Sequence, residues 1–586
     1  MDRRRFLAMA AATAAAAPLP GAAQLASRVD PGLIAEDPRV RLVAWPFFRH
    51  ASPRLDTRYL DPLPIALEDG ARGADPLAHP ACRCAGAVAA GIRECRLPPP
   101  HAAYNASTIF MAGALAADVS GAYDQAGLTD RPAEPGADAA AAYVVAVCDA
   151  AAALFRAEGD SGFTAKPLGP PVNLSWDFKA LEASLLGAIP DGAAKEAGAR
   201  RGAAIAEALL RRRPRLWSAR DLDMQPSEWR ARVCPETPAW MRETPALAWV
   251  ATAPGVGLEP YFRMGYPIAV RMAETPVFAA GEDGAFDLAD HAADLARNLE
   301  DSLEPVAKWG GYHSVHRPPF FDAVGFLFED GASGPPTGVS HVLTALIARY
   351  DLPVAEAARW QALVWAALHR AGNEVWREKY CRNILRPQTA MDRFWPGAWT
   401  NGPAIPSPTF PAYPSGHSCF GASGYRTMLR LLAERGVDGD ALTVWMAAPD
   451  PERWLRQLTR GGDRIAIRFE GLSALAEAGG FSRTACGGIH FWHDDIGGQR
   501  IGEAAASLAY RTLLKPRRAP HRPSLPPMRL TETGALAERW AVEAAERRGR
   551  PAPDLARLDP FPNAPAAVRA ALPPRWLASG MRASYA

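Results

Sequence analysis

Residues 354–387 read VAEAARWQALVWAALHRAGNEVWREKYCRNILRP, and this stretch decides the fold. Apolar side chains recur on it at the spacing of one helix face, at Val364, Ala367, Leu368, Ala371 and Val375. The next position on that face is Lys379, so the pattern points a lysine toward the core. Pro387 ends the helix and leaves Arg386 on the exit loop. The stretch therefore predicts a long buried helix that ends beside two cations.

Lysine is rare in this chain, at six positions among the 65 lysines and arginines. A buried cation needs a partner, because leaving it unpaired in the core is expensive. One interpretation is that nearby carboxylates form salt bridges with Lys379 and Arg386. The other is that the two cations help to bind an anion.

A second segment, residues 410–418, reads FPAYPSGHS and leads into a predicted helix that ends near Gly436. At the start of a helix, Ser415 and Gly416 would direct a hydroxyl and backbone N–H groups outward, which suits an oxyanion. His417 in the first turn could act as an acid or a base beside it. The alternative is that Ser415 is an ordinary N-cap.

A third segment, residues 482–494, reads SRTACGGIHFWHD. Arg483 precedes His490 by seven residues, and Asp494 follows that histidine by four, so the carboxylate can orient the imidazole on one helix face. The competing interpretation takes His490, His493, Asp494 and Asp495 as ligands of a divalent metal. Three cations nearby argue against such a site.

In this order, Lys379-x6-Arg386-Pro387, Pro414-Ser415-Gly416-His417 and Ser482-Arg483-x6-His490-x3-Asp494 resemble a known three-part anion site. It is the site of the vanadium-dependent haloperoxidases and of the related phosphatidic-acid-type and class A acid phosphatases. The resemblance covers roughly residues 287–514. Glu329-Asp330-Gly331 and the string from Phe410 to His417 look like the haloperoxidase branch.

The resemblance implies a role for each matching residue. Lys379, Arg386 and Arg483 would neutralise a vanadate cofactor, and Ser415 and Gly416 would donate to its oxygens. His490 would bond the metal, and His417 would be the acid or base. Asp330 and Asp494 would be supporting carboxylates, with Asp330 holding Arg483. Phe410 matches an aromatic position of the chloroperoxidases, which favours chloride as a substrate.

Two enzymes and one other class remain open. The first is a haloperoxidase that oxidises halide with hydrogen peroxide to a hypohalous acid equivalent, which then halogenates small organic acceptors. The second is a phosphate-ester hydrolase in which His490 attacks phosphorus and His417 protonates the leaving group. The third is a helical protein without catalysis. The length of the chain and its helical N-terminal half favour the haloperoxidase.

The expected fold is all-α, with two helical-bundle halves. Residues 1–27 are expected to be an export signal, 28–250 an N-terminal helical region, 251–515 a C-terminal bundle carrying the oxyanion site, and 516–586 a Pro-rich tail. The apolar run of residues 139–155 is predicted to be a buried helix, so no stable membrane span is expected. The sequence makes no prediction of the oligomeric state.

The first 27 residues resemble a twin-arginine export signal. Arg3-Arg4-Arg5-Phe6-Leu7 precedes an Ala-rich run and Pro18. The alternative, a membrane anchor, is disfavoured because the apolar stretch is short. The resemblance implies the twin-arginine export machinery as a partner and a periplasmic or secreted location in a bacterium.

The composition of the chain bears on its possible partners and on the use of its cysteines. The 586 residues carry 65 basic and 63 acidic side chains, so no large field attracts nucleic acid or an anionic membrane. The eight cysteines suit small buried residues. Two other uses stay open: a zinc site at His79, Cys82, Cys84 and Cys95, and a disulfide between Cys419 and Cys486.

Overall fold

The computed structural model describes most of the chain between residues 65 and 577. The described ranges are 65–68, 78–94, 97, 99–160, 175–212, 245–249, 291–311, 321, 324–325, 327–328, 334–399, 402–405, 407–408, 410–449, 464–518, 525, 533–546, 551, 561 and 564–577. The predicted export signal and Asp330 lie outside them.

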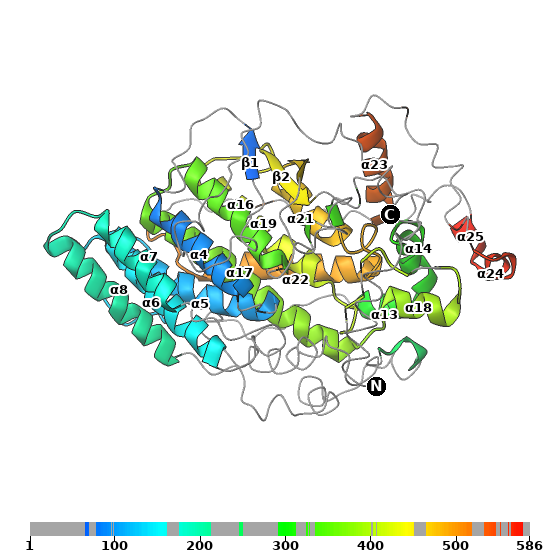
Figure 1. The fold of residues 1–586 in the computed structure, drawn as a ribbon, viewed down its shortest axis with the longest axis horizontal. Helices are drawn as coiled ribbons and strands as arrows, with labels where there is room; N and C mark the ends of the chain where they lie inside the picture. The colour runs from blue at the N-terminus through cyan, green and yellow to red at the C-terminus, as the bar shows by residue number, and fades with distance from the viewer. Residues whose placement is uncertain are drawn as a thin grey trace, which may run out of the picture.

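Helices dominate the described residues, as the sequence predicts (Figure 1). The N-terminal half contributes α4 (Pro80–Glu94), α5 (Pro99–Ala117), α6 (Ala139–Asp160), α7 (Ser175–Gly187) and α8 (Ala193–Arg212). The short 3-10 helix η3 (Pro245–Leu247) follows. In Figure 1 the helices α6, α7 and α8 lie together at one end of the molecule.

The C-terminal half supplies the helices around the predicted site. They are α13 (His291–Arg297), α14 (Leu299–Trp309), α16 (Gly334–Arg349), α17 (Val354–Arg382), α18 (Pro387–Phe394), α19 (Gly416–Glu434), α21 (Leu472–Phe481) and α22 (Trp492–Thr512). The tail adds α23 (Thr533–Glu546), α24 (Ala566–Ala571) and α25 (Pro574–Leu577). Figure 1 shows α17 and α22 crossing the middle of the molecule, with α14 and α18 at the end opposite α8.

The two halves share one hydrophobic core, centred on the packing of α5 against α17. Phe110 stacks on Trp365 with ring centroids 6.0 Å apart. Helix α6, predicted from the apolar run 139–155, is the single described helix long and apolar enough to span a membrane, but 72% of that segment is buried among other helices. It is therefore a core helix of this fold.

A small antiparallel sheet is the one departure from the all-helical expectation. The strands β1 (Ile65–Glu68), β2 (Thr443–Pro449) and β3 (Arg464–Glu470) pair in that order, with Leu67 opposite Val444 and Val444 opposite Phe469. Val444, Met446 and Phe469 face the core and are buried. The alternation of large apolar side chains in β3, at Ile465, Ile467 and Phe469, is the strand signal that the helical prediction overlooked.

The cysteine alternatives find no support. Cys82, Cys84, Cys148, Cys381, Cys419 and Cys486 are buried and free, so the disulfide between Cys419 and Cys486 is wrong. Cys95 lies outside the described residues. No group of three or more metal-ligating His, Cys, Asp or Glu side chains occurs in the part of the chain that the structure describes. That finding removes support for the zinc site and for the divalent-metal interpretation of His490 and its neighbours.

Candidate functional site

Lys379 sits in the last turn of α17 and is completely buried, as the apolar stripe predicts. Its ammonium donates to the carbonyls of Ala412 (2.8 Å), Pro411 (3.2 Å) and Pro414. An ammonium has three N–H donors, so these carbonyls use all of them. Lys379 therefore acts on its surroundings through its charge and fixes the loop before α19.

Arg386 is the residue before α18, whose first position is Pro387. Its Nε donates to the carbonyl of Phe410 (2.9 Å), and its Nη1 donates to the carbonyl of Ile489 (2.8 Å) and lies 3.1 Å from Nε2 of His490. Its Nη2 is buried and has no hydrogen-bond partner among the residues that the structure describes. A buried guanidinium nitrogen without a partner is costly, so the arrangement leaves one strong donor available.

The 410–418 segment begins α19, as predicted, and Ser415 is its N-cap. The hydroxyl oxygen of Ser415 accepts from the N–H of Ser418 (3.3 Å), which bears out the N-cap interpretation. That bond uses a lone pair and leaves the hydroxyl hydrogen of Ser415 for another acceptor. His417, in the first turn, donates from Nε2 to the carbonyl of Phe328 (3.0 Å).

The 482–494 segment runs from the end of α21 into α22. Arg483 is completely buried and donates from Nη2 to the carbonyl of Gly325 (2.6 Å) and from Nε to Ser482 (3.0 Å). His490 is also buried, and its Nδ1 lies 2.9 Å from the carboxylate of Asp494. The predicted contact is confirmed, but α22 begins at Trp492, so His490 lies on the loop before the helix.

Asp494 fixes this loop from the first turn of α22. Its Oδ2 accepts from the N–H of Phe491 (3.0 Å) as well as from His490, and its backbone carbonyl accepts from the N–H of Ser415 (2.8 Å). Burial raises the pKa of Asp494 to about 7, against the lowering influence of Lys379. One carboxylate thus joins two of the three segments.

Both site histidines are held in the neutral form at pH 7. Burial lowers the pKa of His417 to about 4, and the charges of Lys379 and Arg386 add to this effect. Burial, followed by the charge of Arg386, holds the pKa of His490 well below its usual range. With Nδ1–H donating to Asp494, the lone pair of His490 lies on Nε2, the tautomer that its partners dictate.

Three cations and one carboxylate meet here among the described residues, which leaves a formal excess of two positive charges. Burial lowers the pKa of Arg386 to about 9 and that of Arg483 likewise to about 9. Burial also lowers the pKa of Lys379 well below its usual value, with the charge of Arg386 adding to it. The salt-bridge interpretation of Lys379 and Arg386 is not supported, because their hydrogen bonds go to carbonyls and to His490.

Two aromatic rings pack against the cations of the site. The ring of Phe410 lies 4.8 Å from the guanidinium carbon of Arg386 and 5.3 Å from the ammonium of Lys379. The ring of Trp376 packs 5.8 Å from Phe410 and 5.9 Å from that ammonium. Trp376 lies one turn before Lys379 on α17, so helical spacing could have assigned it to the site. These rings exclude water and favour cations over their faces.

Glycines let the first turn of α19 approach its neighbours closely, and the sequence analysis missed their role. A Cβ at Gly498 would lie 2.4 Å from the carbonyl oxygen of Ser415, and one at Gly502 would lie 2.4 Å from that of Cys419. A Cβ at Gly479 of α21 would lie 3.1 Å from the carbonyl of His417. The Gly-x-x-x-Gly spacing in α22 was the available signal, because it places two small residues on one helix face.

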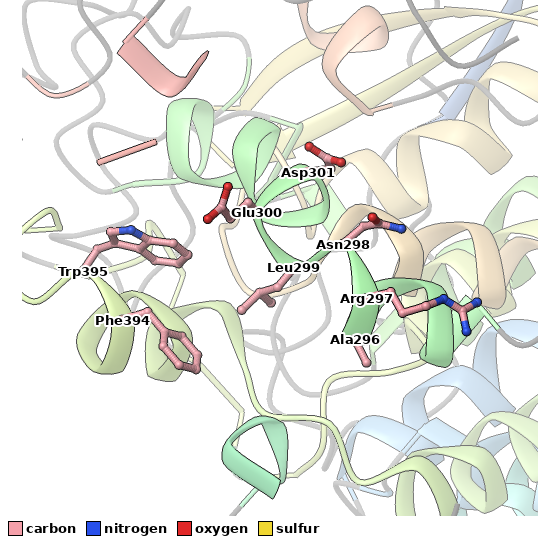
Figure 2. Close-up of a pocket in the computed structure, with 8 residues that line it drawn as sticks. All are labelled: Ala296, Arg297, Asn298, Leu299, Glu300, Asp301, Phe394 and Trp395. Atoms are coloured by element: carbon pink, nitrogen blue, oxygen red, sulfur yellow. The ribbon is translucent and has the colours of Figure 1, made fainter. Parts of the chain in front are cut away.

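A surface hollow of about 620 Å³ lies apart from this cluster, and Figure 2 shows its lining. Its residues are Ala296, Arg297, Asn298, Leu299, Glu300, Asp301, Phe394 and Trp395. None of them belongs to the predicted site. Trp395 follows α18, and this helix starts at Pro387, next to Arg386. The short helix α18 therefore connects the hollow with the predicted anion site.

The fold and the site define a class: a helical-bundle protein in which three helix ends bring buried cations and a neutral histidine together. Comparison with known proteins identifies it further. Residues 359–518, which hold all three segments, match the family model of the VCPO second helical-bundle domain. The vanadium chloroperoxidase of Curvularia inaequalis is 29% identical over 169 residues, which are 24% of this chain and 27% of that protein. The match thus spans about a quarter of that relative. Residues 359–518 are therefore similar to a helical-bundle domain of the vanadium chloroperoxidases.

Solved structures of bacterial proteins are also similar. A vanadium-dependent iodoperoxidase aligns with a TM-score of 0.45 at 16% identity, over 75% of this chain and 98% of its own. A vanadium-dependent chloroperoxidase in its holo form aligns with a TM-score of 0.44 at 15% identity, over 71% of this chain and 92% of its own. The match to the family model is confined to residues 359–518.

Proposed function

We propose that this protein is a vanadate-dependent haloperoxidase that oxidises halide with hydrogen peroxide to a hypohalous acid equivalent. The observation that carries the proposal is the lone pair of His490 Nε2, which points at Arg386 while Nδ1 is held by Asp494. The family supports the choice of vanadate, because its members are named for vanadium. Small organic acceptors would then react with the product.

The residues fit a tetrahedral oxyanion on three counts. Arg386 offers a buried donor without a partner at Nη2. The first N–H groups of α19 have no carbonyl within their own helix, and Ser415 keeps its hydroxyl hydrogen. The excess of two positive charges among the described residues matches an anion of one or two negative charges. His490, Arg386, Arg483, Ser415 and Gly416 would hold vanadate.

Each residue of the site would then have a defined role. Vanadate bound at His490 would supply the activation of hydrogen peroxide for two-electron oxidation of halide. Arg386 and Arg483 would neutralise negative charge in a site that excludes water, and Lys379 would add its charge from behind the 411–414 loop. Asp494 would keep the lone pair of His490 directed at the bound group, because it fixes the tautomer.

His417 would handle the protons of the reaction. It is neutral at pH 7 because burial lowers its pKa to about 4. Its Nε2–H donates to the carbonyl of Phe328, so Nδ1 is the nitrogen that can accept a proton. A neutral imidazole with one free lone pair can take a proton from hydrogen peroxide and return it to the leaving oxygen.

The second candidate is a phosphate-ester hydrolase. The same lone pair of His490 could attack phosphorus, and the same cations could stabilise the charge that develops there. The residues around the anion serve both reactions, so the substrate test must decide.

Reconstitution decides between the two candidates. Purified full-length protein, stripped by chelation and dialysis, should oxidise bromide or iodide with hydrogen peroxide only after vanadate is added. Excess phosphate should suppress the activity by competing for the site. Halide oxidation that persists unchanged after stripping and phosphate treatment would show that vanadate is not the cofactor. Fast, vanadate-inhibited hydrolysis of an aryl phosphate without any halide oxidation would establish the hydrolase instead.

We further propose export by the twin-arginine route on the basis of residues 3–7, RRRFL. Replacing Arg3 and Arg4 by lysine should keep the protein in the bacterial cytoplasm, as cell fractionation would measure. Unchanged periplasmic recovery of that variant would refute the route.

A further inference from the structure

A second buried carboxylate lies beside the site and has no task in the mechanism above. Asp495 follows Asp494 in the first turn of α22 and is only 2% exposed. Its Oδ1 accepts from the side-chain amide of Gln499 (2.7 Å). The buried hydroxyl of Ser418 has no hydrogen bond of ordinary geometry among the described residues, and it lies close enough to this carboxylate to lower its pKa. Burial raises the pKa of Asp495 to about 6, although the neutral donors Gln499 and Ser418 lower it in part.

The carboxylate occupies space that only a glycine leaves open. A Cβ at Gly480, near the end of α21, would lie 1.8 Å from Oδ1 of Asp495 and 2.4 Å from its carboxyl carbon. The backbone carbonyl of Gly480 accepts from the N–H of Arg483 (2.9 Å), so this glycine begins the turn that carries the arginine. Asp495 therefore packs closely against Gly480, the first residue of that turn.

Through Ser418 the same carboxylate reaches the first turn of α19. The N–H of Ser418 donates to the hydroxyl oxygen of Ser415 (3.3 Å), which orients the predicted anion donor. Asp495 thus connects α22, the Gly480 turn and the Ser415 turn, the three pieces that bear the site. Burying the carboxylate of Asp495 costs free energy, and holding these three pieces in place can offset that cost.

We propose that Asp495 is a positioning residue that fixes the Ser415 turn of α19 against the Gly480 turn, so that Ser415 and Arg483 converge on one oxyanion. The proposal deepens the proposed function, because it concerns the same anion site. It holds for vanadate and for phosphate alike, since both are tetrahedral and take the same donors. Asp495 itself does not touch the anion.

The test measures the binding of inorganic phosphate to vanadate-free, full-length protein by calorimetry, with the melting temperature as a second readout. Asp495→Ala should raise the phosphate Kd about tenfold, because the donors lose their common anchor. Asp495→Asn keeps the shape and one acceptor oxygen, so its Kd should stay within about threefold of wild type.

A double-variant cycle through Gly480 makes the test specific. Gly480→Ala alone should raise the Kd about tenfold, because its methyl group collides with the Asp495 carboxylate. In the Asp495→Ala background the same change should add less than about twofold, since the collision is gone. A Gly480→Ala protein that fails to fold leaves the Asp495→Ala and Asp495→Asn comparison to decide.

Asp440 provides a matched control at the other end of α21. Its carboxylate likewise packs against a glycine, Gly471, and it accepts from the N–H and the hydroxyl of Ser473 (2.8 Å each). Asp440→Ala should lower the melting temperature without changing the phosphate Kd. If Asp495→Ala behaves in the same way, its role is structural only and the inference is wrong.

The outcome separates this inference from the proposed function. Wild-type protein that binds phosphate and loses affinity in Asp495→Ala supports the inference, even if it never oxidises halide with vanadate. Wild-type protein that binds neither phosphate nor vanadate overturns both proposals.

Discussion

Two clusters of buried cations in this protein have different hydrogen-bond partners. In the first, Arg426 and Arg430 of α19 both bond to the carboxylate of Glu503 on α22. We call these three residues the clamp. In the second, Arg386 and Arg483 bond to backbone carbonyls, and with Lys379 they form what we call the site cluster.

The difference shows what each cluster is for. The carboxylate of the clamp cancels one of its two positive charges and holds two helices together. Carbonyl oxygens satisfy N–H donors but leave the positive charge in place, so the site cluster keeps a field that attracts an anion. Burial accordingly lowers the pKa of both Arg386 and Arg483 to about 9.

The largest expected effect falls on His490, which the site cluster surrounds. His490→Ala should lower vanadate-dependent halide oxidation by about a thousandfold or more, because under the proposed function it removes the nitrogen that would bond the metal, a loss of several kcal/mol. Bromide oxidation rates at saturating vanadate would measure this. His493→Ala, three residues on and buried near Ser302, is the matched control and should keep at least about half of the rate. Equal losses in both variants would contradict the assignment.

His417 should separate turnover from binding. His417→Ala should leave vanadate affinity within about threefold, since the cations remain, while the rate of halide oxidation falls roughly a hundredfold with the loss of the acid or base. Vanadate titration and steady-state rates on the same preparation would show the split. A variant that loses affinity and rate together would place His417 among the anion ligands.

The two arginine clusters can be compared directly by substitution. Arg386→Met should raise the Kd for inorganic phosphate by roughly tenfold to a hundredfold, the range for a lost charged hydrogen bond. Arg426→Met should leave that Kd unchanged and lower the free energy of unfolding by about 2 kcal/mol, because Glu503 loses one of its partners. Calorimetry and urea unfolding would measure the two effects. Loss of phosphate affinity in Arg426→Met would remove the distinction between the clusters.

Residue periodicity predicted the parts of the site that depend on single elements. The apolar stripe of α17 assigned Lys379 to the core, and the structure has it completely buried. The spacing of His490 and Asp494 predicted their contact, and it is made at 2.9 Å. Spacing within one segment is fixed by local geometry, so it can be read from the sequence.

Contacts between different segments could not be predicted from residue periodicity. The carbonyls that take the donors of Lys379 come from the 411–414 loop, whose course depends on packing. The close approach of Gly498 to Ser415 and of Gly480 to Asp495 likewise arises only when α19, α21 and α22 meet. A sequence shows a glycine but not which backbone approaches it, so Asp495 looked like an ordinary helix residue.

The site cluster should attract anions less strongly in alkaline solution. Burial holds the pKa of Lys379 well below its usual value, so this ammonium loses its proton as the pH rises. Because phosphate remains a dianion, its Kd should rise about tenfold between about pH 8 and pH 10. Anion binding should also take up protons over that range, which calorimetry in buffers of different ionisation enthalpy detects. A flat Kd profile would mean that the ammonium keeps its proton.

The same lowered pKa fixes the sign of a stability effect. A lysine whose folded pKa lies below its unfolded value binds fewer protons when folded, so the empty protein gains stability as the pH rises from the folded pKa of Lys379 toward the unfolded one. Phosphate should reverse this by favouring the charged form. Its stabilisation of the fold, measured as the shift in melting temperature, should therefore be larger at about pH 7 than at about pH 10.

The smallest expected effect concerns halide choice at Phe410, whose ring covers Arg386 at 4.8 Å and Lys379 at 5.3 Å. A phenyl ring adds no hydrogen-bond donor and keeps water from the cations, so their charge is poorly screened and attracts the smallest of the three halides, chloride, most strongly. Phe410→His brings a polar ring and water to the same place. It should lower the rate with chloride relative to bromide by roughly twofold to fivefold, the range of one cation–π contact. Trp376→Phe keeps an aromatic wall beside Lys379 and should change that ratio less than twofold. Steady-state rates with chloride, bromide and iodide at acid pH would measure both variants. A wild type without chloride turnover, or a ratio that moves equally in both variants, would show that the wall does not select the halide.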